Sequence, residues 1–183
     1  MRILVPLANG FEEMEAVILV NMLRRCGAEV VTASITGARE IHGARGINIM
    51  ADTVWQELNL ATFDALAIPG GLGGVTALRD DTRVAALAKK FHAEGKLVAA
   101  ICAAPLVLLD AGLLEGRAFT CHPSVANQIT VGTRQPGRVV EDRGIITAIG
   151  AGATFAFALR VAARLLGEDA AQRAAEAACV LGE

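Results

Sequence analysis

Residues 96–105 read K-L-V-A-A-I-C-A-A-P, and this stretch decides the fold. Lys96–Ile101 is a short apolar run typical of a buried strand. It passes without a turn dipeptide into Cys102, and Leu106–Ala111 then reads as a helix with Pro105 in its first turn. A strand that turns directly into a helix with a nucleophile at the corner is the elbow geometry of α/β hydrolases. The stretch therefore predicts a cysteine elbow with strained backbone angles.

The same alternation of strand and helix continues on both sides of this stretch. The further strands are predicted at Arg2–Leu7, Glu29–Ser34, Ile47–Thr53 and Phe63–Ile68, and Arg138–Asp142 with Ile145–Thr147 predicts an antiparallel hairpin. The further helices are predicted at Glu12–Cys26, Asp80–Glu94, Thr154–Leu166 and Asp169–Cys179. We expect Thr36–Gly46 to be a polar excursion. This order is typical of βαβ units, so we predict one α/β domain over residues 1–183 with a mainly parallel sheet.

Composition excludes several classes of protein. A chain of 183 residues can bury a core without a disulfide or metal. Hydrophobic residues make up 54%, but 35 of them are alanine, and no apolar run approaches the roughly 18–20 residues of a membrane-spanning helix. The net charge is −2, which gives no electrostatic signal for nucleic acid or anionic lipid. We therefore predict neither a nucleic-acid partner nor a membrane partner.

The four cysteines are widely scattered, with no C-x-x-C pair and no His/Cys cluster of zinc-binding spacing. No metal site is predicted. The apolar stretch Ile3-Leu4-Val5 is too short for the hydrophobic region of a signal peptide. We therefore expect a cytoplasmic protein with free thiols.

Three predicted strands are followed by unusual residues. The first strand leads into Gly10-Phe11-Glu12-Glu13-Met14-Glu15, the Phe63–Ile68 strand into Pro69-Gly70-Gly71, and the Lys96–Ile101 strand into Cys102. In an open parallel α/β sheet, ligands bind beyond the carboxyl ends of the strands. If these strands are neighbours, a carboxylate, a pair of exposed N–H groups and a thiol meet in one crevice.

Two of these residues allow two interpretations each. Cys102 near a helix N-terminus favours the thiolate, although a helix dipole contributes only about 0.3–1 kcal/mol, so hydrogen bonds must carry much of a large pKa shift. The alternative for Cys102 is a small buried hydrophobic residue. Glu15 is either solvated, as expected for Glu12 and Glu13, or lies on the apolar side of its helix, where burial favours the protonated form.

Gly70 and Gly71 are either ordinary turn glycines or donors of an oxyanion hole. The Gly71-Leu72-Gly73-Gly74 stretch lacks the last glycine of a dinucleotide fingerprint, and no G-K-[ST] accompanies it. No nucleotide or other cofactor is predicted.

His122 is the histidine best placed to reach the crevice, because it follows a short strand-like segment and a turn. His42 lies in the polar excursion and His92 on a charged helix face, so both are expected on the surface. Cys121 is either a resolving thiol for Cys102 or, as we favour, a plain strand residue.

Four motifs together resemble the ThiJ/PfpI superfamily, and within it the Parkinsonism-associated deglycase branch with its YajL-like bacterial members. They are G-F-E-E-M-E at 10–15, P-G-G at 69–71, A-A-I-C-A-A-P at 99–105 and H-P at 122–123. The resemblance covers nearly the whole chain in order. It implies a flavodoxin-like three-layer sandwich of the class I glutamine-amidotransferase type, and a homodimer.

The resemblance also implies roles for individual residues. Cys102 would be the nucleophilic, oxidation-prone cysteine and Glu15 its protonated hydrogen-bond partner, with His122 lining the pocket. The residues it assigns to oxyanion stabilisation or substrate binding are Gly70, Gly71, Ala103, Arg45 and Arg25. The chain departs from the family where G-P-G-T is replaced by Gly150-Ala151-Gly152-Ala153-Thr154, and where Met50 replaces an interface cysteine of some relatives.

The implied activity is that of a cofactor-independent glyoxalase (a glyoxalase III-like lyase) and protein deglycase. It would convert methylglyoxal or glyoxal to the hydroxy acid through a cysteine hemithioacetal, and remove early glycation adducts as a further activity. The alternative is an oxidative-stress sensor or chaperone that uses oxidation of Cys102. A cysteine peptidase or amidase is the least favoured reading, because the sequence shows no ordered pair of base and orienting residue.

Overall fold

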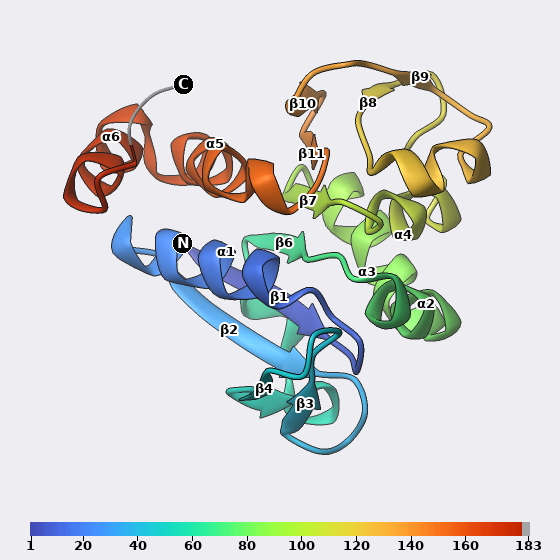
Figure 1. Ribbon diagram of the computed structural model, residues 1–183, viewed down its shortest axis with the longest axis horizontal. Coiled ribbons are helices and arrows are strands. Elements are labelled where there is room, and N and C mark those ends of the chain that lie inside the picture. The colour runs from blue at the N-terminus through green and yellow to red at the C-terminus, as the bar shows by residue number, and fades with distance from the viewer. Residues whose placement is uncertain (181–183) are drawn as a thin grey trace.

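The computed structural model describes residues 1–180, in which seven strands form one sheet in the order β10-β11-β7-β6-β1-β2-β5 (Figure 1). Neighbouring strands are parallel, except that β10 runs antiparallel to β11. The strands are β1 (Arg2–Leu7), β2 (Glu29–Ser34), β5 (Thr53–Val54), β6 (Ala65–Ile68), β7 (Leu97–Ile101), β10 (Val139–Asp142) and β11 (Ile145–Ala148).

Helices cover both faces of this sheet. One face carries α1 (Glu13–Arg25), α5 (Thr154–Leu166) and α6 (Glu168–Ala177), and the other carries α2 (Leu72–Asp80), α3 (Thr82–Ala93) and α4 (Pro105–Asp110) (Figure 1). Successive residues of β1 point to opposite faces, so Ile3 and Val5 join one core while Leu4 joins the other. The predicted three-layer α/β sandwich is confirmed.

Four short strands lie outside the main sheet. β3 (Glu40–His42) and β4 (Asn48–Met50) form an antiparallel hairpin that packs beside the start of α1. β8 (Ala118–Phe119) and β9 (Thr133–Arg134) pair in parallel. Within residues 1–180, short 3₁₀ helices lie at Trp55–Glu57, Leu60–Thr62, Pro123–Gln128 and Ala151–Ala153.

Several predicted elements are confirmed to the residue, one predicted strand is wrong, and two elements were not predicted. Arg2–Leu7, Glu29–Ser34 and Thr154–Leu166 have the predicted bounds. The predicted strand over Ile47–Thr53 is instead divided between β4 and β5, and the predicted polar excursion contains the short strand β3, which was not predicted. Helix α2 was also not predicted, because Gly73 and Gly74 resemble a turn.

The prediction of one domain covers residues 181–183, which lie outside the described residues. Within residues 1–180, no helix is long and apolar enough to cross a membrane.

The strand order places the site. β1, β6 and β7 are consecutive neighbours, so their carboxyl ends, at Leu7, Ile68 and Ile101, meet at one edge of the sheet. The three unusual segments that follow these strands are therefore brought together, as expected from the sequence.

Candidate active site

Cys102 stands at the corner between β7 and α4. Its φ is 65°, in the left-handed region that residues other than glycine rarely adopt. Its N–H donates to the carbonyl of Ala148 in β11 (2.9 Å), and its carbonyl accepts from the N–H of His122 (2.8 Å). The elbow is thus held by two other segments, and its side chain is half-buried.

Glu15 lies in the first turn of α1 and is completely buried. Its Oε2 accepts a 2.7 Å hydrogen bond from the N–H of Gly70. Its Oε1 is also buried and, within residues 1–180, accepts no hydrogen bond from a nitrogen or oxygen. Of the two interpretations of Glu15, the second is therefore correct: the residue is buried on the apolar side of its helix, and its carboxyl interacts with the Cys102 side chain.

Two glycines allow the three segments to approach. A Cβ at Gly70 would lie 2.6 Å from Oε2 of Glu15 and 2.7 Å from Cβ of Cys102. Gly71 has a φ of 91°, and a Cβ there would lie 2.4 Å from the carbonyl oxygen of Gly10 and 2.4 Å from the nitrogen of Glu12. A side chain at either position would therefore push the carboxyl, the thiol or the backbone apart.

The carboxyl and the thiol form a pair that shares a proton. Burial raises the pKa of Glu15 to about 7. Burial, and then the charge of Glu15, raise the pKa of Cys102 to about 12, while the N–H groups of Gly71 and Ala103 act in the opposite direction. Between these two pKa values, one proton belongs to the pair.

Two expectations about these groups need correction. The N–H of Gly70 already donates to Glu15, so it positions the carboxyl and is not a free oxyanion donor. The thiolate is disfavoured in the free protein, because the pKa of Cys102 is raised. The helix that was expected to favour it, α4, has only six residues and begins with Pro105, which has no N–H.

His122 caps the 3₁₀ turn Pro123–Gln128. Its Nδ1 accepts from the N–H of Ser124 (3.2 Å) and lies 2.7 Å from the Ser124 hydroxyl. Because Nδ1 accepts, we assign the proton of the neutral ring to Nε2. A Cβ at Gly150 would lie 3.3 Å from Cδ2 of His122, so the ring borders the turn where the chain departs from the family pattern. Ser124 was not predicted as a partner of His122, because nothing in the sequence marks its contact with the ring.

Cys121 is buried in the core on the α2–α4 side of the sheet, whereas Cys102 packs against the core on the α1–α5 side. Burial also raises the pKa of the Cys121 thiol. The favoured reading of Cys121 as a structural residue therefore agrees with the fold, because the two thiols face opposite layers.

Two glutamates expected to be solvated have structural partners. Glu12 is the N-cap of α1, and its Oε2 accepts from the N–H of Glu15 (2.8 Å). Glu13 is 3% exposed, and its Oε1 accepts from the N–H groups of Arg45 (2.5 Å) and Ile47 (3.3 Å). Burial acts against its charge, yet these N–H groups hold the pKa of Glu13 below its usual value.

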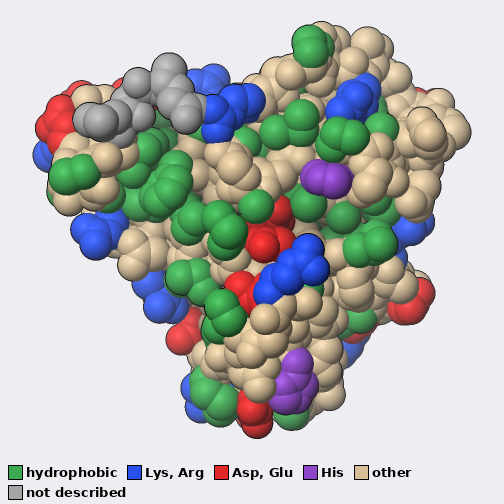
Figure 2. Space-filling view, in the orientation of Figure 1, with side chains coloured by type: hydrophobic (Ala, Val, Ile, Leu, Met, Phe, Trp, Pro, Cys, Tyr) green, Lys and Arg blue, Asp and Glu red, His purple; other side chains and the backbone are tan. Residues whose placement is uncertain are grey.

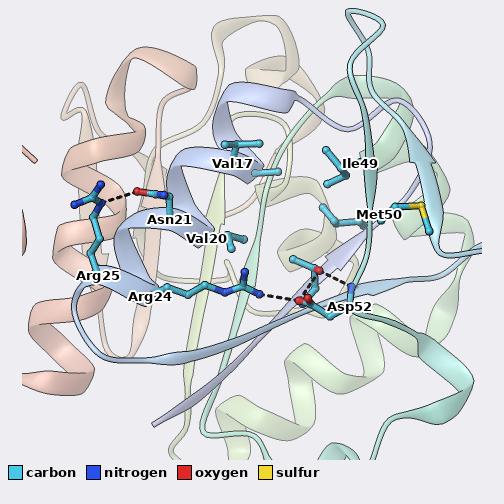
Figure 3. A pocket seen from close by; sticks show the side chains of 11 residues that line it. Val17, Val20, Asn21, Arg24, Arg25, Ile49, Met50 and Asp52 are labelled. Carbon is cyan, nitrogen blue, oxygen red and sulfur yellow. Dashed lines mark hydrogen bonds and ion pairs between the residues drawn. The ribbon is translucent and has the colours of Figure 1, made fainter.

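The two arginines assigned by resemblance lie in different places. Arg45 is exposed in the β3–β4 hairpin, close to the start of α1 through its bond to Glu13. Arg25 is in the last turn of α1, ten residues or about 15 Å along the helix from Glu15. Its Nε donates to the side chain of Asn21 (2.8 Å; Figure 3), so within one chain Arg25 does not belong to the Cys102 site.

A separate groove of about 550 Å³ lies between α1 and the β3–β4 hairpin (Figure 3). Val17, Val20, Ile49 and Met50 line it together with an ion pair between Arg24 and Asp52 (2.8 Å). Figure 2 shows hydrophobic side chains gathered over α1 and α5, with acidic and basic side chains beside them. The groove does not include Cys102.

No group of three or more His, Cys, Asp or Glu side chains within residues 1–180 is arranged to hold a metal ion. The chemistry that this site offers comes from a thiol, a buried carboxyl, two N–H groups and an adjacent imidazole.

Comparison with known proteins gives consistent matches. The model of the DJ-1/PfpI family matches residues 1–164. The dj-1beta protein of Drosophila melanogaster is 37% identical over 175 residues, which is 94% of each chain. Its crystal structure has a TM-score of 0.95 at 36% identity and covers 99% of this chain and 98% of that one.

Two further relatives carry informative names. A protein of Pyrococcus abyssi named as a deglycase is 36% identical over 129 residues, 70% of this chain and 76% of that one. The structure of an oxidized DJ-1 of Toxoplasma gondii has a TM-score of 0.92 at 37% identity and covers 97% of each chain.

Proposed function

The chain belongs to the DJ-1/PfpI family, and from this premise we propose that it is a cofactor-independent glyoxalase acting on methylglyoxal or glyoxal. The observation that carries the proposal is the Cys102–Glu15 pair, in which a nucleophile and a buried carboxyl share one proton beside two N–H donors. This is the minimum set needed for covalent catalysis with proton transfer.

The first step is attack of Cys102 Sγ on the aldehyde carbon. A C–S bond forms, the thiol proton moves to Glu15, and the aldehyde oxygen becomes negative. We assign Oε1 of Glu15 as the acceptor, because this atom is free of N–H and O–H donors within residues 1–180. The N–H groups of Gly71 and Ala103 stabilise the oxyanion before Glu15 returns the proton to it and gives the hemithioacetal.

The second step moves hydrogen within the substrate. Glu15 removes the proton from the aldehyde carbon to form an enediolate and delivers it to the neighbouring carbon, while His122 assists transfer of a proton between the two oxygens. The result is a thioester of the 2-hydroxy acid. Water then cleaves the C–S bond and restores the thiol, so that one substrate molecule and one water give the acid without any external oxidant.

Removal of early glycation adducts is a further part of the proposal. The name of the Pyrococcus abyssi relative supports it for that protein. Because adducts release aldehyde, a glyoxalase lowers their level indirectly. The two activities are separated by following adduct loss while a chemical scavenger traps all free aldehyde, since only direct deglycation is then faster with enzyme than without it.

A second function, sensing of oxidative stress, is favoured by the same N–H groups. Donors from Gly71 and Ala103 aimed at the sulfur would stabilise a sulfinate formed by peroxide, and protonated Glu15 would add another hydrogen bond. A peptidase or amidase is less well supported, because His122 is held by Ser124 and not by a carboxylate.

We also propose that the chain is a homodimer, with a second copy covering the groove beside α1. Large apolar side chains are exposed on this face, with Met14 55%, Val17 50% and Met50 65% exposed. Val17 and Met50 line the groove between α1 and β4, and Met14 lies in the first turn of the same helix. An exposed apolar patch of this kind is typical of a protein interface.

The decisive experiment is turnover of methylglyoxal by the purified protein, followed as lactate, with Cys102→Ser measured in parallel. We expect lactate from the wild type and none from the variant. Absence of lactate from the wild type, with selective oxidation of Cys102 by mild peroxide, would exclude the glyoxalase and favour the sensor.

A further inference from the structure

Glu12 touches the site in two ways that the proposed mechanism does not use. Its side chain accepts from the N–H of Glu15 (2.8 Å), and its own N–H donates to the carbonyl of Gly70 (2.9 Å). One residue therefore ties the first turn of α1 to the segment that carries the N–H donor for Glu15.

Glutamate is not among the residues preferred as an N-cap, which are Ser, Thr, Asp and Asn. A hydroxyl or a shorter side chain would satisfy the same N–H group. What glutamate adds is a full negative charge on the side of the helix where Glu15 is buried. This charge raises the pKa of Glu15, after the larger effect of burial.

We propose that Glu12 is a positioning residue of this site: its carboxylate fixes the first turn of α1 and holds a negative charge beside Glu15, so that the shared proton is retained. The inference deepens the proposed function and rests on it. Glu12 does not touch the reacting atoms in this proposal. It acts through Glu15.

The groups that face Glu15 are few. From α1 there is Glu12, from the elbow there is Cys102, and from the segment after β6 there is the N–H of Gly70. Cys102 and Gly70 lower the pKa of Glu15, whereas burial and Glu12 raise it. Within this set, Glu12 is the charged group that can be removed without removing the nucleophile.

The test compares two isosteric variants, Glu12→Gln and Glu13→Gln. Both replacements keep a carbonyl oxygen that can accept the existing N–H bonds, and both remove one negative charge from the start of α1. The two side chains point to different neighbours: Glu13 faces the β3–β4 hairpin and is absent from the groups that act on Glu15. Glu13→Gln is thus the matched control.

The readout is the titration of Glu15 by carboxyl-labelled ¹³C NMR, with its signal assigned through Glu15→Gln. We expect Glu12→Gln to move the midpoint to lower pH and Glu13→Gln to leave it in place. The alkylation rate of Cys102 should change with pH in step with this midpoint. An unmoved midpoint in Glu12→Gln, or an equal shift in both variants, would overturn the inference.

Glu12→Ala separates charge from capping. It loses the cap as well as the charge, so its melting temperature should fall by roughly 2–4 °C, while that of Glu12→Gln should stay close to wild type. An Ala variant as stable as wild type would contradict the fixing role.

The NMR titration needs no turnover, so the two proposals fail separately. A shifted midpoint without lactate from the wild type would uphold the role of Glu12 in tuning the proton and reject the glyoxalase. Lactate formation by the wild type together with an unshifted midpoint in Glu12→Gln would support the glyoxalase and reject the role of Glu12.

Discussion

At the scale of single residues, Glu15 is a carboxyl group kept where its charge is costly. Its pKa rises from 4.5 to about 7, and a rise of this size corresponds to about 3 kcal/mol. Because the folded-state value is the higher one, the stability linked to protonation is fully present below pH 4.5 and is lost as pH rises through 7. Burial of Glu15 therefore lowers the stability of the protein near neutral pH, and it also gives the site a carboxyl that titrates in this pH range.

Glu15→Gln should remove this dependence. We expect the unfolding free energy of the wild type to fall by up to about 3 kcal/mol more than that of the variant between pH 4.5 and pH 8. Urea unfolding of both proteins at several pH values measures this difference. Parallel stability curves for the two proteins would show that Glu15 does not titrate in this range.

Gly70→Ala should damage the site through contact alone. The new Cβ would meet Oε2 of Glu15 and Cβ of Cys102, so we expect a loss of about 1–3 kcal/mol of stability together with loss of turnover. Thermal unfolding and the lactate assay check both effects. Gly152→Ala is the control, because a Cβ at Gly152 meets no atom within 4 Å; equal effects from both changes would refute the explanation.

Residue types and strand ends marked the candidate positions of the site, but the family resemblance assigned their roles. Glu15 and Cys102 follow strands whose carboxyl ends meet at one edge of the sheet, whereas His122 follows the separate strand β8 and was assigned to the site through the family resemblance. The orientation of α1 could not be deduced, since Glu13 is buried by the β3–β4 hairpin and Met14 is exposed. That hairpin is itself a tertiary feature without a strong sequence pattern.

At the scale of elements, β11 supports the site from the side opposite to α1. Ala148 accepts the N–H of Cys102, and the neighbouring Thr147 Oγ1 accepts the buried N–H of Thr120 (2.9 Å). Thr120 begins the segment that carries His122. One strand therefore holds both the elbow and the segment leading to the imidazole.

Thr147→Val should leave the N–H of Thr120 buried without an acceptor, at a cost of about 1–3 kcal/mol. We expect reduced stability and lower turnover, because the segment leading to His122 loses its anchor. Denaturant unfolding and the lactate assay measure the two effects. Thr76→Val, on the exposed side of α2, should change stability by less than about 0.5 kcal/mol. A similar loss in both variants would contradict the role of the anchor.

Strands and helices with a regular pattern of hydrophobic residues could be predicted from the sequence, whereas elements that depend on tertiary contacts could not. β1, β2 and α5 follow from apolar patterns bounded by breakers. α2 was missed because its glycines serve close approach: a Cβ at Gly74 would lie 2.8 Å from the nitrogen of Phe11. From the sequence alone, two adjacent glycines that form a turn cannot be distinguished from two that allow a helix to approach a neighbouring backbone.

At the scale of the whole molecule, the groove beside α1 should govern self-association. Val17→Asp places a charge on a half-exposed apolar position of this groove, so we expect a shift from dimer to monomer with little change in fold. Sedimentation velocity over a range of concentrations measures it. Ala86→Asp, on exposed α3 across the sheet, should leave the association state unchanged; a wild type that is monomeric at every concentration would reject the dimer.

The hydrogen bond from Cys102 to Ala148 also has a consequence for how the protein is made. During synthesis, β7 and its cysteine emerge well before β11, so the nascent chain carries the thiol without the strand that holds its backbone. Parallel pairing between segments distant in the sequence is intrinsically slow. A stalled chain that ends before residue 145 lacks the acceptor for the Cys102 N–H, so we expect the thiol to reach its native reactivity only after β11 has paired with β7.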